Sequence, residues 1–353
     1  MKRAYQSGVF LLALGISLFF FSLTGAGFLL RAETSPTFGV DLNKVEVFTE
    51  KGAAEKSMMN WTDGYVTVKG LGLPLRKASP AQVKPTARRA AVVDGQRNLA
   101  ETIAGVRVTS ETTVKNMELQ SDVVRTSLKA FVKGAEVLNE KMLPDGTCEV
   151  TMRAPIWGIK SLNEIILPAC SEQEGMTSPP PAEPDTSPSG EEATGVVIVL
   201  PENRKANPAL ITEVYPEGQK EPVYDLGEVS PSSASTDGTA LHLNLKPEKG
   251  PGGCRSPWHL AGLDLPSLLL ARAAWADPVT RSKLERRAGK RPLFIQAVSA
   301  RGKLGSAIVV SQKDAARITA ANAGSGCLKD ARVVVLHRSG IIKGEIPLHL
   351  SAR

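Results

Sequence analysis

The chain has 353 residues, of which 42% are hydrophobic and 5% aromatic, and its formal net charge is +7. This length suits about two domains, and the apolar fraction is enough for a packed core, which argues against global disorder. Surfaces that bind single-stranded nucleic acid combine basic residues with clustered aromatic ones. Because no such cluster occurs, we expect no nucleic-acid partner.

The N-terminus has the pattern of an export segment. Lys2 and Arg3 precede an apolar run that begins at Val9 and ends at Leu30. Such a run is long enough to span a bilayer, and cations ahead of it predict that the following chain is translocated. We therefore expect residues 1–32 to be a cleaved signal peptide or an inner-membrane anchor. The remainder would be periplasmic, either soluble or tethered. Because the sequence has no second apolar run of this length, we do not expect a polytopic membrane protein.

The cysteines are Cys148, Cys170, Cys254 and Cys327. An exported location permits disulfides, and four cysteines allow three sets of pairs, among which the sequence does not choose. None of them has the CxxC spacing that is typical of zinc sites, so we expect no metal. No cysteine lies near the end of the apolar run, so we expect no N-terminal lipid.

A first α+β domain is predicted over 60–158, after an extended lead-in over 33–59. Alternating residues predict a strand over 65–68 that stops at the glycines of 70–72. Small residues at helical spacing predict a helix over 86–104 that packs closely on a sheet, and Gly105 ends it. The other predicted elements are a β-rich stretch over 106–114, a helix over 122–132, and a hairpin of strands 135–142 and 147–154.

A linker is predicted over 171–194, because this segment has five prolines and six acidic residues but no basic one and cannot bury apolar surface. An aliphatic run over 195–200 then predicts a strand buried on both faces, which opens a second α+β domain over 195–353. Its other predicted elements are a hairpin over 209–224, strand 241–243, helices 268–275 and 279–287, strands 293–298 and 307–310, a helix that Ser311 caps, and strand 332–336. The predicted fold class is α+β, with helices packed on a mainly antiparallel sheet in each of the two domains.

Patterns of known catalytic sites are missing. The sequence has no GxSxG, Walker or HExxH pattern, and its four histidines are dispersed. We therefore expect a protein that is not an enzyme and that holds no cofactor. One charge feature is a candidate site, because a helix would place several of its cations on one face, where anionic lipid headgroups or cell-wall polymer could bind. An ordinary solvated helix has the same pattern. The basic run consists of Arg281, Lys283, Arg286, Arg287, Lys290 and Arg291.

Residues 87–106 read ARRAAVVDGQRNLAETIAGV. Together with Ser121-Asp122-Val123-Val124, Lys133-Gly134-Ala135 and Asp145-Gly146, this stretch resembles the bacterial twenty-kilodalton-lipoprotein family. It is also similar to the N-terminal domain of flagellar assembly protein T. The resemblance covers about residues 60–158 and implies a long helix against a curved sheet, with no catalytic residues.

The second half is similar to a companion region of exported members of this family, for example at Val310-Ser311-Gln312 and Pro292-Leu293-Phe294. It departs from them at Val199-Leu200-Pro201, where similar proteins carry Asp-Ala-Arg, and it also lacks their lipidated cysteine. The resemblance implies a non-enzymatic exported envelope protein, with envelope or flagellar proteins as partners. The alternatives are a cell-wall-directed hydrolase or ligand-binding protein, and a secretion-system accessory.

Overall fold

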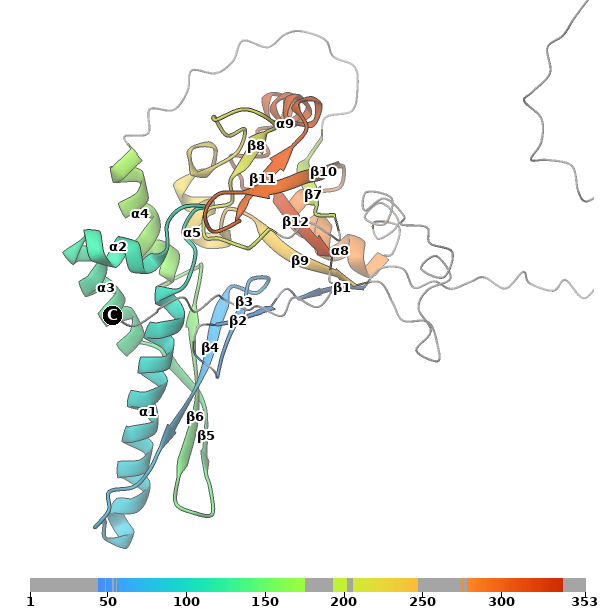
Figure 1. The fold of residues 1–353 in the computed structure, drawn as a ribbon. Coiled ribbons are helices and arrows are strands. Elements are labelled where there is room, and N and C mark those ends of the chain that lie inside the picture. The colour runs from blue at the N-terminus through green and yellow to red at the C-terminus, as the bar shows by residue number, and fades with distance from the viewer. Residues whose placement is uncertain are drawn as a thin grey trace, which may run out of the picture. The chain divides into compact units, whose positions relative to one another are not determined.

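The computed structural model describes residues 44–47, 49–52, 54, 56–174, 193–201, 206–246, 275 and 278–338. The predicted export segment and Cys254 lie outside them, as do most of the predicted linker and of the predicted helix over 268–275. No helix among the described residues is long and apolar enough to cross a membrane. Helices and two separate sheets make up the described chain, which confirms the predicted α+β class (Figure 1).

The first sheet is antiparallel throughout, as predicted. In order across the sheet, its strands are β2 (Thr49–Lys51), β3 (Ser57–Asn60), β4 (Tyr65–Gly72), β6 (Cys148–Pro155) and β5 (Glu136–Met142). The predicted hairpin is confirmed as β5 and β6. Its turn is held by a 2.9 Å hydrogen bond from the Thr147 amide to the carboxylate of Asp145.

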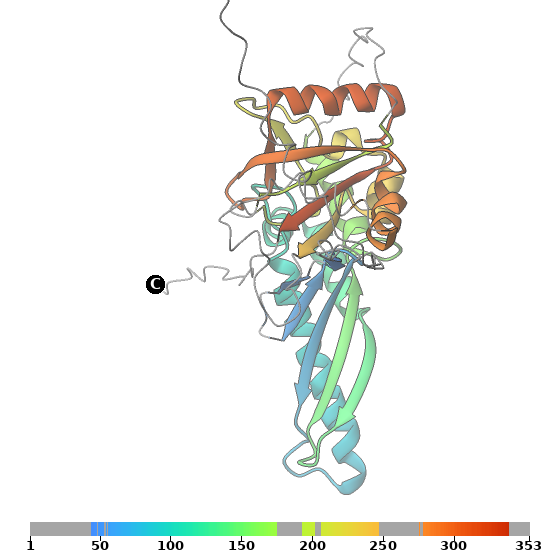
Figure 2. The same ribbon diagram turned by 90° about the vertical axis from the view of Figure 1, so that its right-hand side faces the viewer.

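One face of this sheet is covered by the long helix α1 (Pro80–Ala104), which runs along β4 and β6 (Figures 1 and 2). The helix rests directly on β4, because a Cβ atom added to Gly70 or Gly72 would overlap backbone atoms of Ala91. Gly95 and Ala87 are the other small residues at this contact. The close packing predicted from the small residues is therefore confirmed. The strand ends within the predicted segment, at Gly72, although it continues through Gly70. Both glycines also let the helix approach the strand.

The helix α1 begins earlier than predicted, at Pro80 rather than near residue 86. Ser79 and Gln82 form a capping box there, in which the Ser79 amide donates to the side chain of Gln82 at 3.1 Å. Three further helices complete this part of the chain: α2 (Val114–Gln120), α3 (Asp122–Lys133) and α4 (Leu162–Glu174). Because α4 reaches Glu174, the first residues of the predicted linker are helical.

The prediction of a β-rich stretch over 106–114 is wrong. Only the bridge between Arg107 and Thr113 has β pairing there, and α2 begins at Val114. The alternating valines of this loop are buried all the same. They face the core from a turn rather than from a strand, and the backbone of the loop pairs with segments far along the chain.

The second sheet is mixed. In order across the sheet, its strands are β1 (Lys44–Val47), β9 (Leu241–Lys246), β12 (Val333–Arg338), β7 (Gly195–Val199), β10 (Pro292–Arg301), β11 (Ala307–Val310) and β8 (Val214–Pro216). The pairs β1–β9 and β10–β11 are antiparallel, and the other four are parallel. The sheet is therefore not mainly antiparallel as predicted, because its central strands are joined by long connections that permit parallel pairing.

Both faces of the central strand β7 are buried, as predicted. On one face, Val197 and Val199 pack with Leu284 of helix α8 (Pro278–Ala288). On the other face, Val196 and Ile198 join the main core. Among its described residues, this part also holds the helices α5 (Pro231–Asp237) and α9 (Gln312–Ser325). Helix α9 is capped by Ser311, as predicted, through a 3.1 Å bond from the Asp314 amide.

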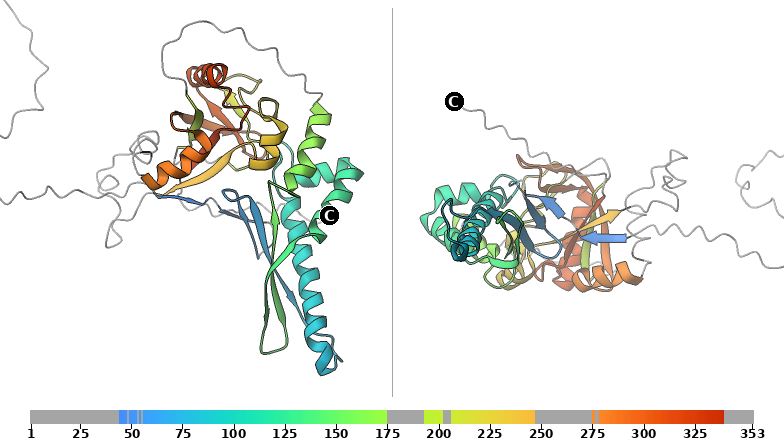
Figure 3. Two further views of the ribbon diagram at one scale, coloured as in Figure 1. Left: turned by 180° about the vertical axis from the view of Figure 1, so that it is seen from behind. Right: turned by 90° about the horizontal axis from the view of Figure 1, so that it is seen from below.

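The predicted lead-in connects the two sheets. Its strand β1 pairs with β9 of the second sheet, and β2 pairs with β3 of the first sheet (Figure 3). We call the first sheet with α1 to α4 the first part, and the second sheet with α5, α8 and α9 the second part. Both parts lie within one compact unit, Val40–Arg353.

Candidate functional site

A loop of the first part, residues 106–111, forms main-chain hydrogen bonds with the second part. The amide of Leu210 donates to the carbonyl of Arg107, and the amide of Leu304 donates to the carbonyl of Ser110, each at 2.9 Å. The same loop uses side chains as well, since the Ser110 amide donates to the carboxylate of Glu213 at 2.7 Å. The loop thus satisfies its backbone groups with segments about a hundred and two hundred residues further along the chain.

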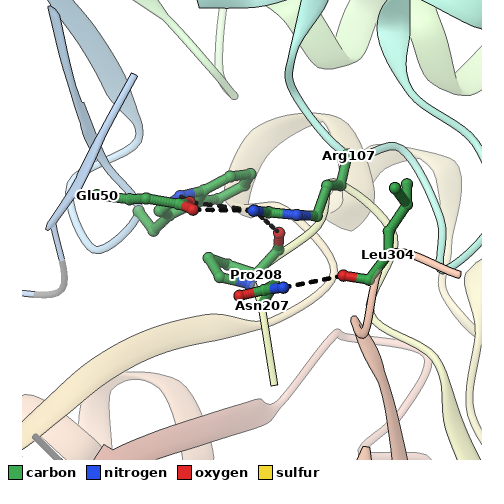
Figure 4. A network of polar contacts seen from close by, with 6 residues as sticks. Glu50, Arg107, Asn207, Pro208 and Leu304 are labelled. Atoms are coloured by element: carbon green, nitrogen blue, oxygen red, sulfur yellow. Dashed lines mark hydrogen bonds and ion pairs between the residues drawn. The ribbon is translucent and has the colours of Figure 1, made fainter. Parts of the chain in front are cut away.

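A buried ion pair reinforces this junction (Figure 4). The guanidinium of Arg107 donates to both carboxylate oxygens of Glu50, at 3.0 and 3.2 Å, and to the carbonyl of Pro208 at 3.4 Å. The indole of Trp61 donates to the same carboxylate at 3.2 Å. Only 14% of the Arg107 side chain and 11% of the Glu50 side chain are exposed. The network therefore joins the lead-in, the first part and the second part.

Two of the four histidines meet in the core. The register of β9 and β12 brings the Nδ1 of His242 to 2.9 Å from the Nε2 of His337, so that one nitrogen donates and the other accepts. Burial, with a smaller contribution from Arg287, lowers the pKa of His242 to about 3. Burial and the neighbouring His242 hold the pKa of His337 well below its usual value. Burial thus favours the neutral form of both rings at physiological pH.

The largest described groove lies in the first part and has a volume of about 720 Å³. It is bounded by the turn before β4, the last turns of α3, the adjoining ends of β5 and β6, and the first turn of α4. Its apolar lining includes Tyr65, Ala130, Phe131, Trp157 and Ile165, and its charged residues are Asp63, Glu136, Arg153, Lys160 and Glu164. No histidine is among the residues that line it.

The side chains of the groove are held in place by their neighbours. The guanidinium of Arg153 lies 5.7 Å from the ring centroid of Tyr65 and pairs with Glu136 at 3.0 Å. Trp157 covers Gly64, whose φ of 72° and lack of a side chain make room for the indole. The lining of the groove thus combines aromatic side chains with charges of both signs.

The predicted basic run is confirmed as helical in α8 and continues past its end. Arg286 and Lys290 are exposed, whereas Arg287 points inward and donates to the carbonyl of Gly238 at 2.7 Å. Burial lowers the pKa of the Arg287 guanidinium. Arg287 therefore does not belong to an exposed anion-binding face. Arg281 is exposed and donates to the carbonyl of Trp275 at 3.0 Å.

One stretch of the chain matches a known family. Residues 272–339 match the family model for the second domain of Treponema pallidum Tp0624. No curated protein matches the chain. The matched stretch holds α8, β10, β11, α9 and β12, which is about a fifth of the chain. The likeness thus concerns the second part and includes the basic run, but not the groove.

The cysteines do not come together in the described chain. Cys148 lies in β6 of the first sheet and Cys327 follows α9, and each is a buried free thiol. Cys170 is buried in α4. Among the residues that the structure describes, no group of three or more histidine, cysteine or acidic side chains is placed to hold a metal ion.

Proposed function

We propose that this chain is a non-enzymatic, exported envelope protein whose first part binds a segment of a partner protein in the groove between α3, α4 and the ends of β4, β5 and β6. The observation that carries the proposal is the groove itself, whose lining combines aromatic side chains with charges of both signs. Aromatic residues and arginine are enriched where proteins bind one another. The contacts of Arg153 with Tyr65 and Glu136 would partly order its side chain before a partner binds, which lowers the entropy cost of binding.

The loop beside the groove supports the same use. Ile159 lies between Trp157 and Lys160, which both line the groove, and its side chain is exposed. A large exposed aliphatic residue next to an aromatic-lined groove is typical of a surface that a partner covers. The charges of the rim would set which partner segment fits, and in which direction.

The expected location follows from the N-terminal run, which predicts translocation with or without retention as an anchor. The partner would accordingly be a periplasmic or envelope protein. The resemblance of residues 60–158 to the flagellar domain makes an assembly factor of the flagellum one specific version of the proposal.

The test is a cross-linked pull-down from envelopes of the native bacterium, made with two arginine variants of α3. Ala130→Arg places a long cation in the groove from an exposed position, while Val123→Arg changes an exposed position of the same helix that does not line the groove. We expect the wild type and Val123→Arg to recover the same envelope protein and Ala130→Arg to lose it. Recovery of that protein by Ala130→Arg, or no envelope protein with the wild type, would overturn the proposal. Unchanged motility of a deletion strain would rule out the flagellar version.

A further inference from the structure

The loop between β4 and α1 exposes large apolar side chains. Leu73 is 71% exposed and Leu75 is 66% exposed, and Val93 of α1 is 58% exposed. Leu75 and Val93 both line a shallow groove of about 530 Å³ between this loop and the helix. Exposed aliphatic residues that gather in this way mark a surface that something apolar covers.

Basic residues surround these apolar ones. Arg76 and Lys77 follow directly in the loop, and both are exposed. Arg89 and Arg97 flank Val93 at spacings of four residues, so the three side chains lie on one stripe of α1. None of these four cations forms an ion pair with another residue in the described ranges.

One acidic residue, Asp94, lines the same groove. The carboxylate of Asp94 accepts the Leu71 amide at 2.9 Å and the side chain of Asn98 at 3.4 Å. Glu140 of β5 pairs with Arg88 at 2.7 Å. Four cations against the one carboxylate of Asp94 leave this surface with a net positive charge, which would attract an anionic partner.

We propose that the β4–α1 loop and the adjoining stripe of α1, comprising Leu73, Leu75, Arg76, Lys77, Arg89, Val93 and Arg97, form a membrane-contact surface that binds a bilayer containing anionic lipids. Apolar side chains that enter the acyl region, flanked by cations at the headgroups, are the combination by which peripheral surfaces bind such membranes. A soluble phosphate or an anionic wall polymer would contact the cations and leave the leucines in water.

The local structure suits such a contact. The loop is held by a bond from the Ala78 amide to the carbonyl of Leu75 at 3.0 Å, and the helix after it begins with a capping box. The turn of the β5–β6 hairpin lies at the same end of the first sheet, where Gly146 is close to Pro74 and Val83 (Figure 2). The leucines are thus presented from a braced end of the sheet, and insertion would need little ordering of the loop.

The basic run of α8 provides a comparison within the same chain. It carries exposed cations, but none of the exposed large apolar side chains of the described residues lies in α8. If charge alone drove binding, both surfaces would contact anionic membranes equally. If the leucines matter, only the β4–α1 surface would do so.

The test is hydrogen exchange of the full chain reconstituted in vesicles, read out peptide by peptide. Because the predicted anchor would hold the chain on any bilayer, the comparison is between phosphatidylglycerol-containing and pure phosphatidylcholine vesicles. We expect amides of 73–79 to exchange several-fold more slowly on the anionic vesicles. Leu73→Ser with Leu75→Ser, and separately Arg76→Gln with Lys77→Gln, should remove this protection, each pair weakening the contact on the order of tenfold or more.

The control variant is Arg286→Gln with Lys290→Gln in α8, which should leave the protection of 73–79 unchanged. All the substituted side chains are exposed, so the variants should fold. Protection that does not depend on lipid charge, or that survives in the leucine variant, would overturn the proposal. It would also be overturned if a soluble anionic polymer without lipid gave the same protection, since that would show binding by charge alone.

Discussion

Replacing Arg107 by methionine should destabilise the protein strongly, because it removes one member of a buried ion pair. The substitution keeps the apolar stem and deletes the guanidinium, which donates to Glu50 at 3.0 and 3.2 Å and to Pro208 at 3.4 Å. Glu50 would then remain buried with the indole of Trp61 as its hydrogen-bond donor. Breaking a buried pair in this way costs about 3–5 kcal/mol. Since both side chains keep some exposure, 14% and 11%, we expect a loss near the lower end of that range.

A second substitution, Glu50→Met, distinguishes the net contribution of the ion pair from the cost of leaving one charge buried alone. In the double variant no charge is left buried, so its free energy of unfolding should lie within about 1 kcal/mol of the wild type. If each single variant loses about 3 kcal/mol and the double variant about 1 kcal/mol, the double-mutant cycle gives a coupling of roughly 5 kcal/mol. The matched control is Arg88→Met, which breaks an exposed pair with Glu140 and should cost less than about 1 kcal/mol.

The assay is urea unfolding at pH 7, followed by tryptophan fluorescence and circular dichroism, with the slope of each transition compared among variants. Trp61, one of four tryptophans, is fully buried beside the pair, so its share of the emission should respond to changes at the junction. The reasoning is refuted if Arg107→Met costs no more than Arg88→Met. It is also refuted if the double variant loses the sum of the two single losses, since the pair would then be uncoupled.

Three further predictions concern packing and pH. Gly70→Ala should cost about 1–3 kcal/mol in urea unfolding, because the added methyl group overlaps the backbone of α1; an unchanged midpoint would show that the helix moves freely. Gly64→Ala should cost a similar amount and shift the emission of Trp157, because the indole lies where the methyl group would be, and wild-type spectra would contradict this. The pKa values of His242 and His337 are lower in the folded chain than in the unfolded chain. As the pH falls below about 6.5, these histidines therefore take up protons in the unfolded chain but not in the folded one. Stability should then fall by up to about 1.4 kcal/mol per pH unit for each histidine, and a His242→Asn/His337→Asn variant should lose less between pH 6.5 and 5; equal losses would exclude the pair as the cause.

The elements that sequence predicted well are those whose pattern is local. The hairpin turn at Asp145 and Gly146, the helix that packs on Gly70 and the Ser311 cap each depend on residues within a few positions of one another or on one face of a helix. The aliphatic strand β7 belongs to this group too, since a strand buried on both faces has an uninterrupted run of apolar residues. For such elements, the types of the neighbouring residues are enough to predict the local structure and its burial.

The features that sequence missed depend on pairing between distant segments. His242 and His337 are separated by 95 residues, and only the register of two parallel strands brings them together. Arg287 resembles its basic neighbours in sequence, yet it turns inward to a carbonyl of the second part. The groove of the first part was not predicted either, because its lining comes from five separate elements, none of which carries a recognisable motif.

The loop 106–111 resembles a strand in sequence, yet it ties the two parts of the chain together. Its valines alternate as in a half-buried strand, but the carbonyls of Arg107 and Ser110 receive their hydrogen bonds from the second part. A fragment limited to the predicted first domain would leave these carbonyls without their partners. It would also lose Glu50, and so leave the guanidinium of Arg107 without its carboxylate. In the fragment these groups would be hydrated, so each lost hydrogen bond would cost about 0.5–1.5 kcal/mol. The apolar core would be opened as well, because a single cluster of buried residues includes side chains of both parts. Together these losses approach the whole stability of a small domain, about 5–15 kcal/mol. The two parts that look separable in the sequence should therefore unfold together, in a single cooperative transition.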